Sequence, residues 1–207
     1  MSLFSPWLRR KRFAKVKPFI EGDVLDMGCG PAEILAETDV VVRSYFGIDH
    51  SANVVVANRQ RFPEHQFRVA DVDDDCFDID GKFDRILMIA LVEHVYNLKH
   101  LFKQACGLLK PDGKVIITTP TPFGNDLVHR IGAKLGLFAQ SAADDHICVF
   151  NRKRFQILAR DFDLRIEKYR TFELGCNQLV VLSRERHARH AATTETSGEC
   201  VRPSCHS

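Results

Sequence analysis

The chain of 207 residues is 45% hydrophobic and 27% charged, which is enough apolar material for one sizeable core and too little length for two ordinary domains. Its formal net charge is only +2, so it lacks the strong positive field of proteins that bind nucleic acid mainly through phosphates. Small-molecule chemistry without a nucleic-acid partner is therefore the better starting hypothesis, and the oligomeric state is left open.

Seven cysteines are scattered along the chain without the paired spacing of a metal site, and no secretory leader is expected before them. We therefore expect a reducing, cytoplasmic environment and no bound metal. The longest apolar run, residues 86–92, is far shorter than the roughly 20 residues that cross a bilayer. This run predicts a buried strand, and the chain is expected to have no transmembrane segment.

Residues 1–19 are predicted to form a basic N-terminal helix. Phe4, Trp7 and Leu8 fall at helical spacing, and the first seventeen residues contain no acid. The basic residues are Arg9, Arg10, Lys11, Arg12, Lys15 and Lys17. The simpler interpretation is a helix that packs on the domain with its basic face in solvent, and contact with a membrane surface is the alternative.

From residue 20 to residue 183, short β-branched or apolar runs alternate with stretches of helical pattern. Strands are predicted near 22–27, 45–49, 66–70, 83–90, 113–119, 164–171 and 175–182. Helices are predicted at about 31–38, 51–61, 97–109 and 152–161. The fold class is therefore α/β, with a doubly wound, mostly parallel, seven-stranded sheet that closes with an antiparallel edge strand.

Two segments do not follow this alternation. Residues 120–149 interrupt it after the fifth predicted strand, and we expect them to form a lid insertion. Residues 184–207 hold too few large apolar side chains to offset the entropy of ordering them, so this tail is expected to be disordered. Its cysteines and histidines have no ligand spacing of a known closed metal site.

A hydrophobic strand runs into a glycine turn at residues 24–30, Val-Leu-Asp-Met-Gly-Cys-Gly. Gly28 and Gly30 allow close approach of the backbone to a ligand, and Pro31 suits the first turn of a following helix. The N-terminus of that helix would present free amides to an anionic group. The turn predicts a ligand site, although an ordinary strand-to-helix connection has the same composition.

The second predicted strand ends at Asp49, 21 positions after Gly28. In a doubly wound sheet an acid at this place accepts hydrogen bonds from the ribose hydroxyls of a nucleoside. The alternative for Asp49 is a helix cap, a role that Ser51 can also fill. A nicotinamide dinucleotide suits the same spacing, but its fingerprint requires a small residue where this chain has Glu33.

The successive motifs of residues 20–120 resemble those of the class I S-adenosylmethionine-dependent methyltransferases, which have a Rossmann-like fold. The resemblance is carried by residues 24–30, Gly-Ile-Asp at 47–49, Val-Ala-Asp-Val at 69–72, Phe-Asp at 83–84, Glu-His-Val at 93–95 and Leu-Lys-Pro-Asp-Gly-Lys at 109–114. Each motif is weak alone, but together and in this order they are specific for the superfamily. They do not specify the acceptor.

This resemblance implies S-adenosylmethionine as the cofactor and a set of residues that bind it. Gly28 and Gly30 would hold the methionine portion near Asp26, and Asp49 would hold the ribose. Asp71 would accept a hydrogen bond from the adenine amino group, and Val72 would add a backbone hydrogen bond. Ala90 ends the fourth strand, which in this family lies beside the methyl group and the adenosine.

Catalytic candidates are less defined, because methyl transfer from a sulfonium needs mainly positioning. Certain quinone-type O-methyltransferases have a Glu-x-x-Glu-His metal site, but Ala90 stands where the first glutamate would be, which argues against a metal near Glu93 and His94. A histidine suits removal of a hydroxyl proton, so His146 and His94 are the candidate bases. A structural role for His94 and no role for His146 are the alternatives.

The sequence therefore predicts transfer of a methyl group to a small-molecule acceptor or to a lipid-like or glycan-like one. Oxygen is the expected methylated atom, with nitrogen and carbon left open. The lid segment is similar to inserts of methyltransferases that act on such acceptors. Two alternatives belong to other classes, an NAD(P)-dependent oxidoreductase and a protein that binds the cofactor without catalysis.

Overall fold

The computed structural model describes residues 5–36, 41–73, 79–126 and 147–185. The helices are α1 (Ser5–Val16), α2 (Ala52–Arg61), α3 (Leu98–Leu108) and α6 (Arg152–Asp161), with 3-10 helices η1 (Lys17–Phe19), η2 (Glu33–Ala36) and η3 (Val92–His94). The strands are β1 (Asp23–Met27), β2 (Ser44–Asp49), β3 (Gln66–Val69), β4 (Phe83–Ile89), β5 (Leu109–Pro120), β6 (Leu164–Phe172) and β7 (Asn177–Arg184).

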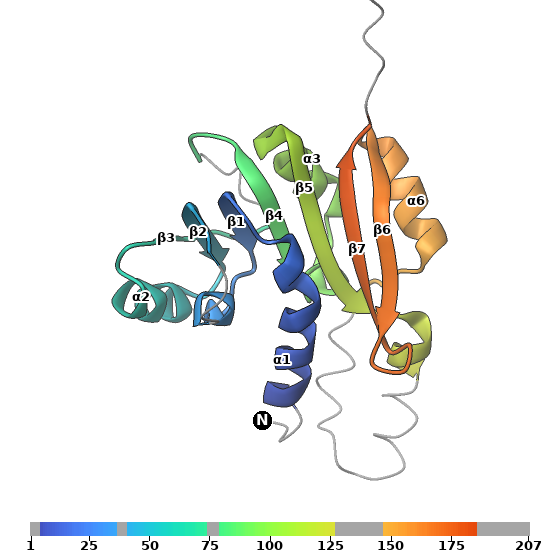
Figure 1. Cartoon of the computed structure of the whole chain (residues 1–207), viewed down its shortest axis with the longest axis horizontal. Helices are drawn as coiled ribbons and strands as arrows, with labels where there is room; N and C mark the ends of the chain where they lie inside the picture. Colours follow the sequence, from blue (N-terminus) through green and yellow to red (C-terminus); the bar gives the residue numbers. More distant parts are fainter. Residues whose placement is uncertain (1–4, 37–40, 74–78, 127–146, 186–207) are drawn as a thin grey trace, which may run out of the picture.

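The seven strands form one sheet in the order β3-β2-β1-β4-β5-β7-β6 (Figure 1). The pairs from β3 through β5 are parallel, whereas β7 is antiparallel to both of its neighbours, β5 and β6. The predicted α/β fold with a doubly wound, mostly parallel sheet is therefore confirmed. Because the carboxyl ends of parallel strands meet at one edge, the segments after β1, β2, β3, β4 and β5 lie there together.

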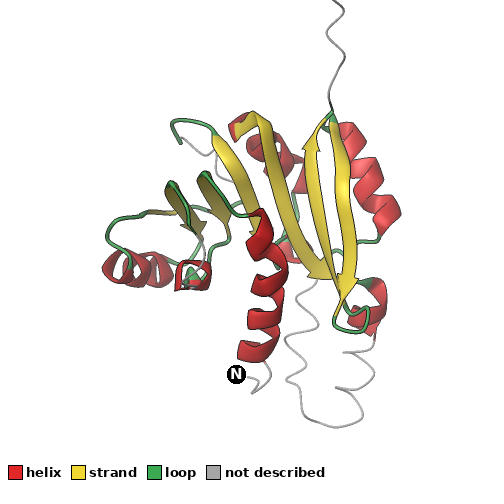
Figure 2. Ribbon diagram, viewed as in Figure 1, coloured by secondary structure: helices red, strands yellow, loops and turns green. Residues whose placement is uncertain are grey.

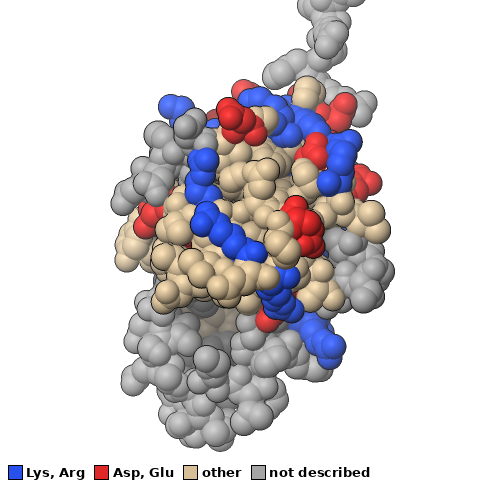
Figure 3. Space-filling view, turned by 90° about the vertical axis from the view of Figure 1, so that its left-hand side faces the viewer, with Lys and Arg blue, Asp and Glu red and all other residues tan. Residues whose placement is uncertain are grey.

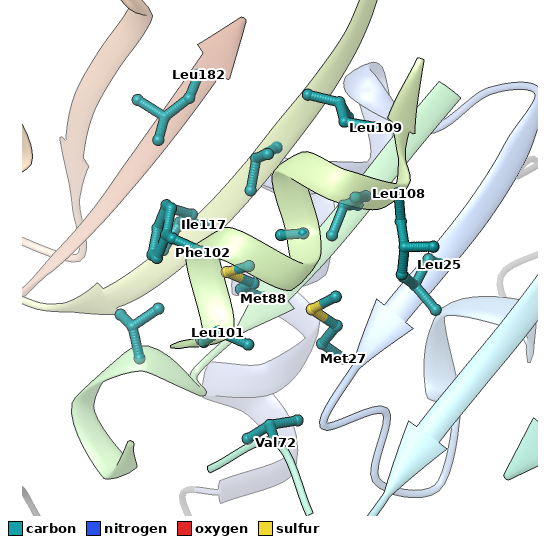
Figure 4. Packing of buried hydrophobic residues seen from close by; sticks show 14 of the residues in the cluster. Leu25, Met27, Val72, Met88, Leu101, Phe102, Leu108, Leu109, Ile117 and Leu182 are labelled. Carbon is teal, nitrogen blue, oxygen red and sulfur yellow. The ribbon is translucent and has the colours of Figure 1, made fainter. Parts of the chain in front are cut away.

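Helices pack on both faces of the sheet (Figure 2). Successive residues of a strand point to opposite faces, so Ile116 joins the apolar cluster that contains Val16 of the α1 end, whereas Ile117 joins the cluster of α3 and α6. Figure 4 shows Met27, Met88 and Leu101 within the second cluster. Burial of these faces orders the strand edge that carries the site.

The region around the fifth strand differs from the prediction. We expected the fifth strand to begin near residue 113, but β5 begins at Leu109, and its register with β4 shifts between Phe83 and Arg85. Lys110 explains the difference, because its ammonium pairs with Asp23 at 2.7 Å and with Asp84 at 2.8 Å. These ion pairs hold the start of β5 against β1 and β4. Likewise, β7 extends to Arg184, slightly beyond the predicted end of the ordered chain.

Parts of the predicted lid and tail lie outside the described residues. Residues 122–126 are helical and residues 147–150 are described, but the centre of the expected lid, 127–146, is not among the described residues, and neither is 186–207 of the tail. Among the described residues, no helix combines the length and the apolar character that crossing a membrane requires.

Candidate functional site

The glycine turn connects β1 with the segment that follows it. Gly28 and Gly30 have positive φ angles of 70° and 50°. The amides of Gly28 and Cys29 both donate to the carbonyl of Ile48, at 2.8 and 2.9 Å. A Cβ atom on Gly28 would lie 2.8 Å from Cδ1 of Leu91, so both the backbone angle and the close approach require glycine there.

The described part of the predicted helix at 31–38 differs from the prediction. The structure has instead the short 3-10 helix η2, and Ala32 just before it has a left-handed φ of 48°. The amide of Ala32 donates to the carbonyl of Cys29, so a tight turn directly precedes η2. Within the described residues 31–36, the turn is followed by the 3-10 helix η2 in place of the α-helix whose N-terminus we expected to bind an anionic group. Polar ligand contacts there fall to the side chains around the turn.

Asp49 joins the end of β2 to this turn. Asp49 is 8% exposed, and its two carboxylate oxygens accept hydrogen bonds from the amides of Gly30 and Ser51, both at 2.9 Å. Ser51 in turn caps α2, since its hydroxyl accepts from the amide of Val54. A carboxylate has about four lone-pair positions, so Asp49 retains two acceptor positions for hydroxyl groups of a ligand.

Asp26 lies beneath the turn and is 4% exposed. The buried hydroxyl of Tyr45 donates to its Oδ2 atom at 2.6 Å. Burial raises the pKa of Asp26 to about 7, the Tyr45 hydrogen bond lowers it, and the nearby charge of Asp49 raises it further. A carboxyl group with such a pKa gains a favourable interaction when a cationic ligand group approaches it.

Two contributors to this region were missed from the sequence, Tyr45 and Asn58. Asn58 is 2% exposed and donates from Nδ2 to the carbonyl of Gly30 at 2.7 Å. It lies on the same face of α2 as the buried Val55, three positions earlier, so a polar residue on the apolar face of that helix was the available signal. Both side chains fix the turn from elements that are distant in the sequence.

The segment after β3 has one exposed and one buried candidate. Asp71 is exposed and accepts a hydrogen bond from the amide of Asp73 at 2.9 Å, whereas Val72 is buried. Asp73 accepts a hydrogen bond from the amide of Asn97 at 2.7 Å. It thereby links the end of β3 to the start of α3.

After β4, the chain turns sharply at Ala90, which has a φ of 53° and donates from its amide to the carbonyl of Thr118 at 2.8 Å. The next residue, Leu91, reaches the glycine turn. His94 in η3 has an exposed side chain, whereas Glu93 is 3% exposed. Ala90 and His94 therefore both lie at the carboxyl edge of the sheet with the glycine turn.

The sequence predicted no role for Glu93, yet its buried Oε2 atom has no hydrogen-bond partner among the described residues. Burial raises the pKa of this carboxyl group, against smaller lowering effects from its own backbone and from Thr119. Its carbonyl accepts from the amides of Ile147 and Cys148, which fixes the chain that follows the expected lid. The other candidate base, His146, lies outside the described residues.

The polar groups around the glycine turn fit the chemistry of the expected cofactor. S-adenosylmethionine carries a positive ammonium and a positive sulfonium together with ribose hydroxyls, and the site offers two buried carboxyl groups, Asp26 and Asp49, beside a backbone turn that has no side chain at Gly28 and Gly30. Within the described residues, no group of three His, Cys, Asp or Glu is arranged to hold a metal ion.

Comparison with known proteins also indicates a methyltransferase. The family described as "Methyltransferase domain" matches residues 4–169. A putative methyltransferase, 235L of Invertebrate iridescent virus 6, is 22% identical over 159 residues, which are 73% of this chain and 58% of the viral protein. A ubiquinone biosynthesis O-methyltransferase of Bradyrhizobium diazoefficiens is 28% identical over 100 residues, 46% of this chain and 39% of that protein. The chain thus spans less than two thirds of these relatives.

Among solved structures, the magnesium protoporphyrin IX methyltransferase of Synechocystis PCC 6803, with bound S-adenosylhomocysteine, superposes with a TM-score of 0.61. It is 16% identical, and the match covers 86% of this chain and 82% of that one, so the likeness shows a shared fold. An acid at the end of β2, such as Asp49, fits both a methyltransferase and an NAD(P)-dependent oxidoreductase. The family match favours the methyltransferase over the oxidoreductase. The chain belongs to the methyltransferase domain family.

Proposed function

We propose that the chain transfers a methyl group to an oxygen atom of an apolar, lipid-like small molecule. The observation that supports this most directly is an apolar rim at the carboxyl edge of the sheet. Tyr96, Phe123 and Ile147 are 81%, 57% and 38% exposed, and they follow β4, follow β5 and precede α6, respectively. Large apolar side chains in water at the mouth of a site favour an apolar ligand.

The cofactor roles proposed for the turn follow from the donor set. The backbone of Gly28 and Gly30 would hold the methionine portion, with the carboxyl group of Asp26 near its ammonium. The free lone pairs of Asp49 would accept the ribose hydroxyls. The bound cofactor would supply an activated methyl group on a sulfonium.

The adenine and the reacting end would be held by the segments after β3 and β4. Asp71 is exposed and would accept from the adenine amino group, with the backbone of Val72 beside it. Ala90, whose left-handed backbone turns the chain away from β4, would leave room for the methyl group. The acceptor would approach from the rim.

An oxygen acceptor is supported by the chemistry of the relatives and by the available bases. The Bradyrhizobium relative is named as an O-methyltransferase that acts in ubiquinone biosynthesis. A hydroxyl nucleophile benefits from a base within reach, for which His94 on η3 is the described candidate and His146 the second. A glycan-like acceptor shares the hydroxyl chemistry but would not use the apolar rim.

The test is a methyl-transfer assay with methyl-labelled S-adenosylmethionine and two catechols that share one nucleophile, one with a short prenyl chain and one without. We expect the prenylated catechol to be methylated with a higher kcat/KM, mainly through a lower KM. Phe123→Ser should remove this preference, while Ile157→Ser, an equally apolar exposed residue on α6, should not. Labelling of protein or RNA in a cell extract, with neither catechol methylated, would refute the proposal.

A further inference from the structure

A cationic trough lies between the N-terminal helix and the outer strands, apart from the cofactor turn. It has a volume of about 490 Å³ and is lined by α1, η1, β6 and β7. A second hollow of about 400 Å³ shares Ala14, Lys15, Thr171 and Phe172 with it, so the two form one continuous depression. We call this depression the α1–β6 trough and define it by Lys11, Lys15, Phe19, Lys168, Arg170 and Phe172.

The rim of the trough is strongly cationic. Lys11 and Lys15 come from α1, and Lys168 and Arg170 come from β6, 153 to 159 positions further along the chain. Glu173 is the single acid that lines either hollow. Within the described residues, Lys15 and Arg170 form no ion pair with a carboxylate. By contrast, Figure 3 shows Lys and Arg interspersed with Asp and Glu on the β3 side of the molecule.

The floor of the trough is apolar. Phe172 and Leu179 are 9% and 2% exposed, and Phe19 is half-buried. The ammonium of Lys168 lies over the ring of Phe19, 4.8 Å from its centroid. A ligand that combines an anionic group with an apolar portion therefore complements this surface better than a simple inorganic anion does.

The turn between β6 and β7 adds a second, independent observation. Leu174 at its tip is 99% exposed, and it follows Glu173, which lines the trough. Both residues have positive φ angles, 55° and 53°. A leucine in the left-handed region with no packing contact contributes nothing to folding, whereas an isolated apolar side chain on a turn tip beside cations suits insertion into the boundary of a bilayer.

We propose that the α1–β6 trough and Leu174 dock the protein on the surface of a membrane that contains anionic phospholipids. The phosphate groups contact Lys11, Lys15, Lys168 and Arg170, and Leu174 enters the region between the headgroups and the acyl chains. Each cation near such a surface strengthens binding by about five-fold, so four together give roughly 600-fold, whereas one partly inserted leucine gives about ten-fold. The cations therefore dominate, and neutral membranes are expected to bind weakly.

The experiment is co-sedimentation of the full chain with vesicles of phosphatidylcholine alone or with about 30% phosphatidylglycerol. We expect binding to the anionic vesicles that disappears as the salt concentration rises toward roughly 0.5 M, because salt screens exposed charges. The double variant Lys168→Glu, Arg170→Glu should weaken binding at least 25-fold, from about five-fold per residue. Leu174→Ser should weaken it several-fold and leave its salt dependence unchanged.

The matched control is Lys99→Glu with Lys103→Glu, the same change of charge on exposed residues of α3, on the other face of the sheet. It should bind anionic vesicles almost like the unaltered chain. Equal losses in both double variants, equal binding to neutral vesicles, no binding to either, or displacement from vesicles by an acidic peptide at low concentration would overturn the proposal. Calorimetric titration with S-adenosylhomocysteine shows that each variant is folded, and it tests the cofactor site separately from the membrane contact.

Discussion

Replacement of Asp26 by asparagine should stabilise the protein at alkaline pH and leave it almost unchanged in acid. The side chain is 4% exposed, and burial raises its pKa from 3.8 to about 7. Asparagine has the same shape and no charge, and its Oδ1 atom can still accept the hydrogen bond from Tyr45. The substitution therefore removes the cost of a buried charge while it keeps the packing.

The size and sign of the effect follow from proton linkage. Below pH 3.8 the carboxyl group is protonated in both the folded and the unfolded chain, so its full contribution is present there. Between 3.8 and about 7 the unfolded chain ionises first, and the free energy of unfolding falls by about 1.4 kcal/mol per pH unit. Above about 7 the accumulated loss is about 4 kcal/mol, and Asp26→Asn should recover most of it.

Urea unfolding of both proteins at about pH 5 and about pH 8, without cofactor, measures this difference. We expect Asp26→Asn to raise the free energy of unfolding by about 3 kcal/mol more at the higher pH than at the lower one. Between about pH 5 and about pH 7 the unaltered protein loses about 1.4 kcal/mol per pH unit through Asp26. Asp112→Asn, the same change at an exposed residue of β5, should alter stability by less than about 0.5 kcal/mol at either pH. An equal effect of Asp26→Asn at both pH values would refute the reasoning.

Three further predictions concern the same turn. Gly28→Ala should lower the free energy of unfolding in urea by about 2 kcal/mol or more, because Gly28 has a positive φ and a Cβ atom there would lie 2.8 Å from Leu91. The double variant Gly28→Ala, Leu91→Ala should lose less stability than the sum of the two single variants. Tyr45→Phe removes a hydrogen bond that lowers the pKa of Asp26. The pH midpoint of S-adenosylmethionine binding, measured by calorimetry, should therefore move upward. A downward or absent shift would contradict the proposed role of Asp26. Asp49→Ala should weaken S-adenosylhomocysteine binding about 100-fold, because it removes charged hydrogen bonds that contribute about 3 kcal/mol. Circular dichroism should show that this variant keeps its fold. Unaltered affinity would argue against ribose binding by this residue.

The succession of strands and helices along the chain, the mostly parallel sheet and the location of the glycine turn could be predicted from the sequence. Apolar runs of strand length alternate with helical patterns, and Gly28, Gly30 and Asp49 stand at strand ends, which parallel pairing brings to one edge. These features depend on local periodicity and on the chirality of the crossovers, so a single sequence carries them. The family resemblance added the cofactor.

The tertiary structure alone decided which side chains complete the site. The Tyr45 contact with Asp26 spans 19 positions, and the Asn58 contact with Gly30 spans 28. Neither follows from periodicity, because each depends on how α2 and β2 pack against the turn. The left-handed turn at Ala32 that precedes η2 was likewise not predicted from the sequence.

The α1–β6 trough shows the same division between sequence and structure. The sequence predicted a basic helix at the N-terminus, but not that Lys15 would lie across a hollow from Lys168 and Arg170. Local patterns specify which residues become helix or strand and which face each one buries. Only the packing of those elements, driven by the apolar area that they bury together, sets which distant side chains become neighbours.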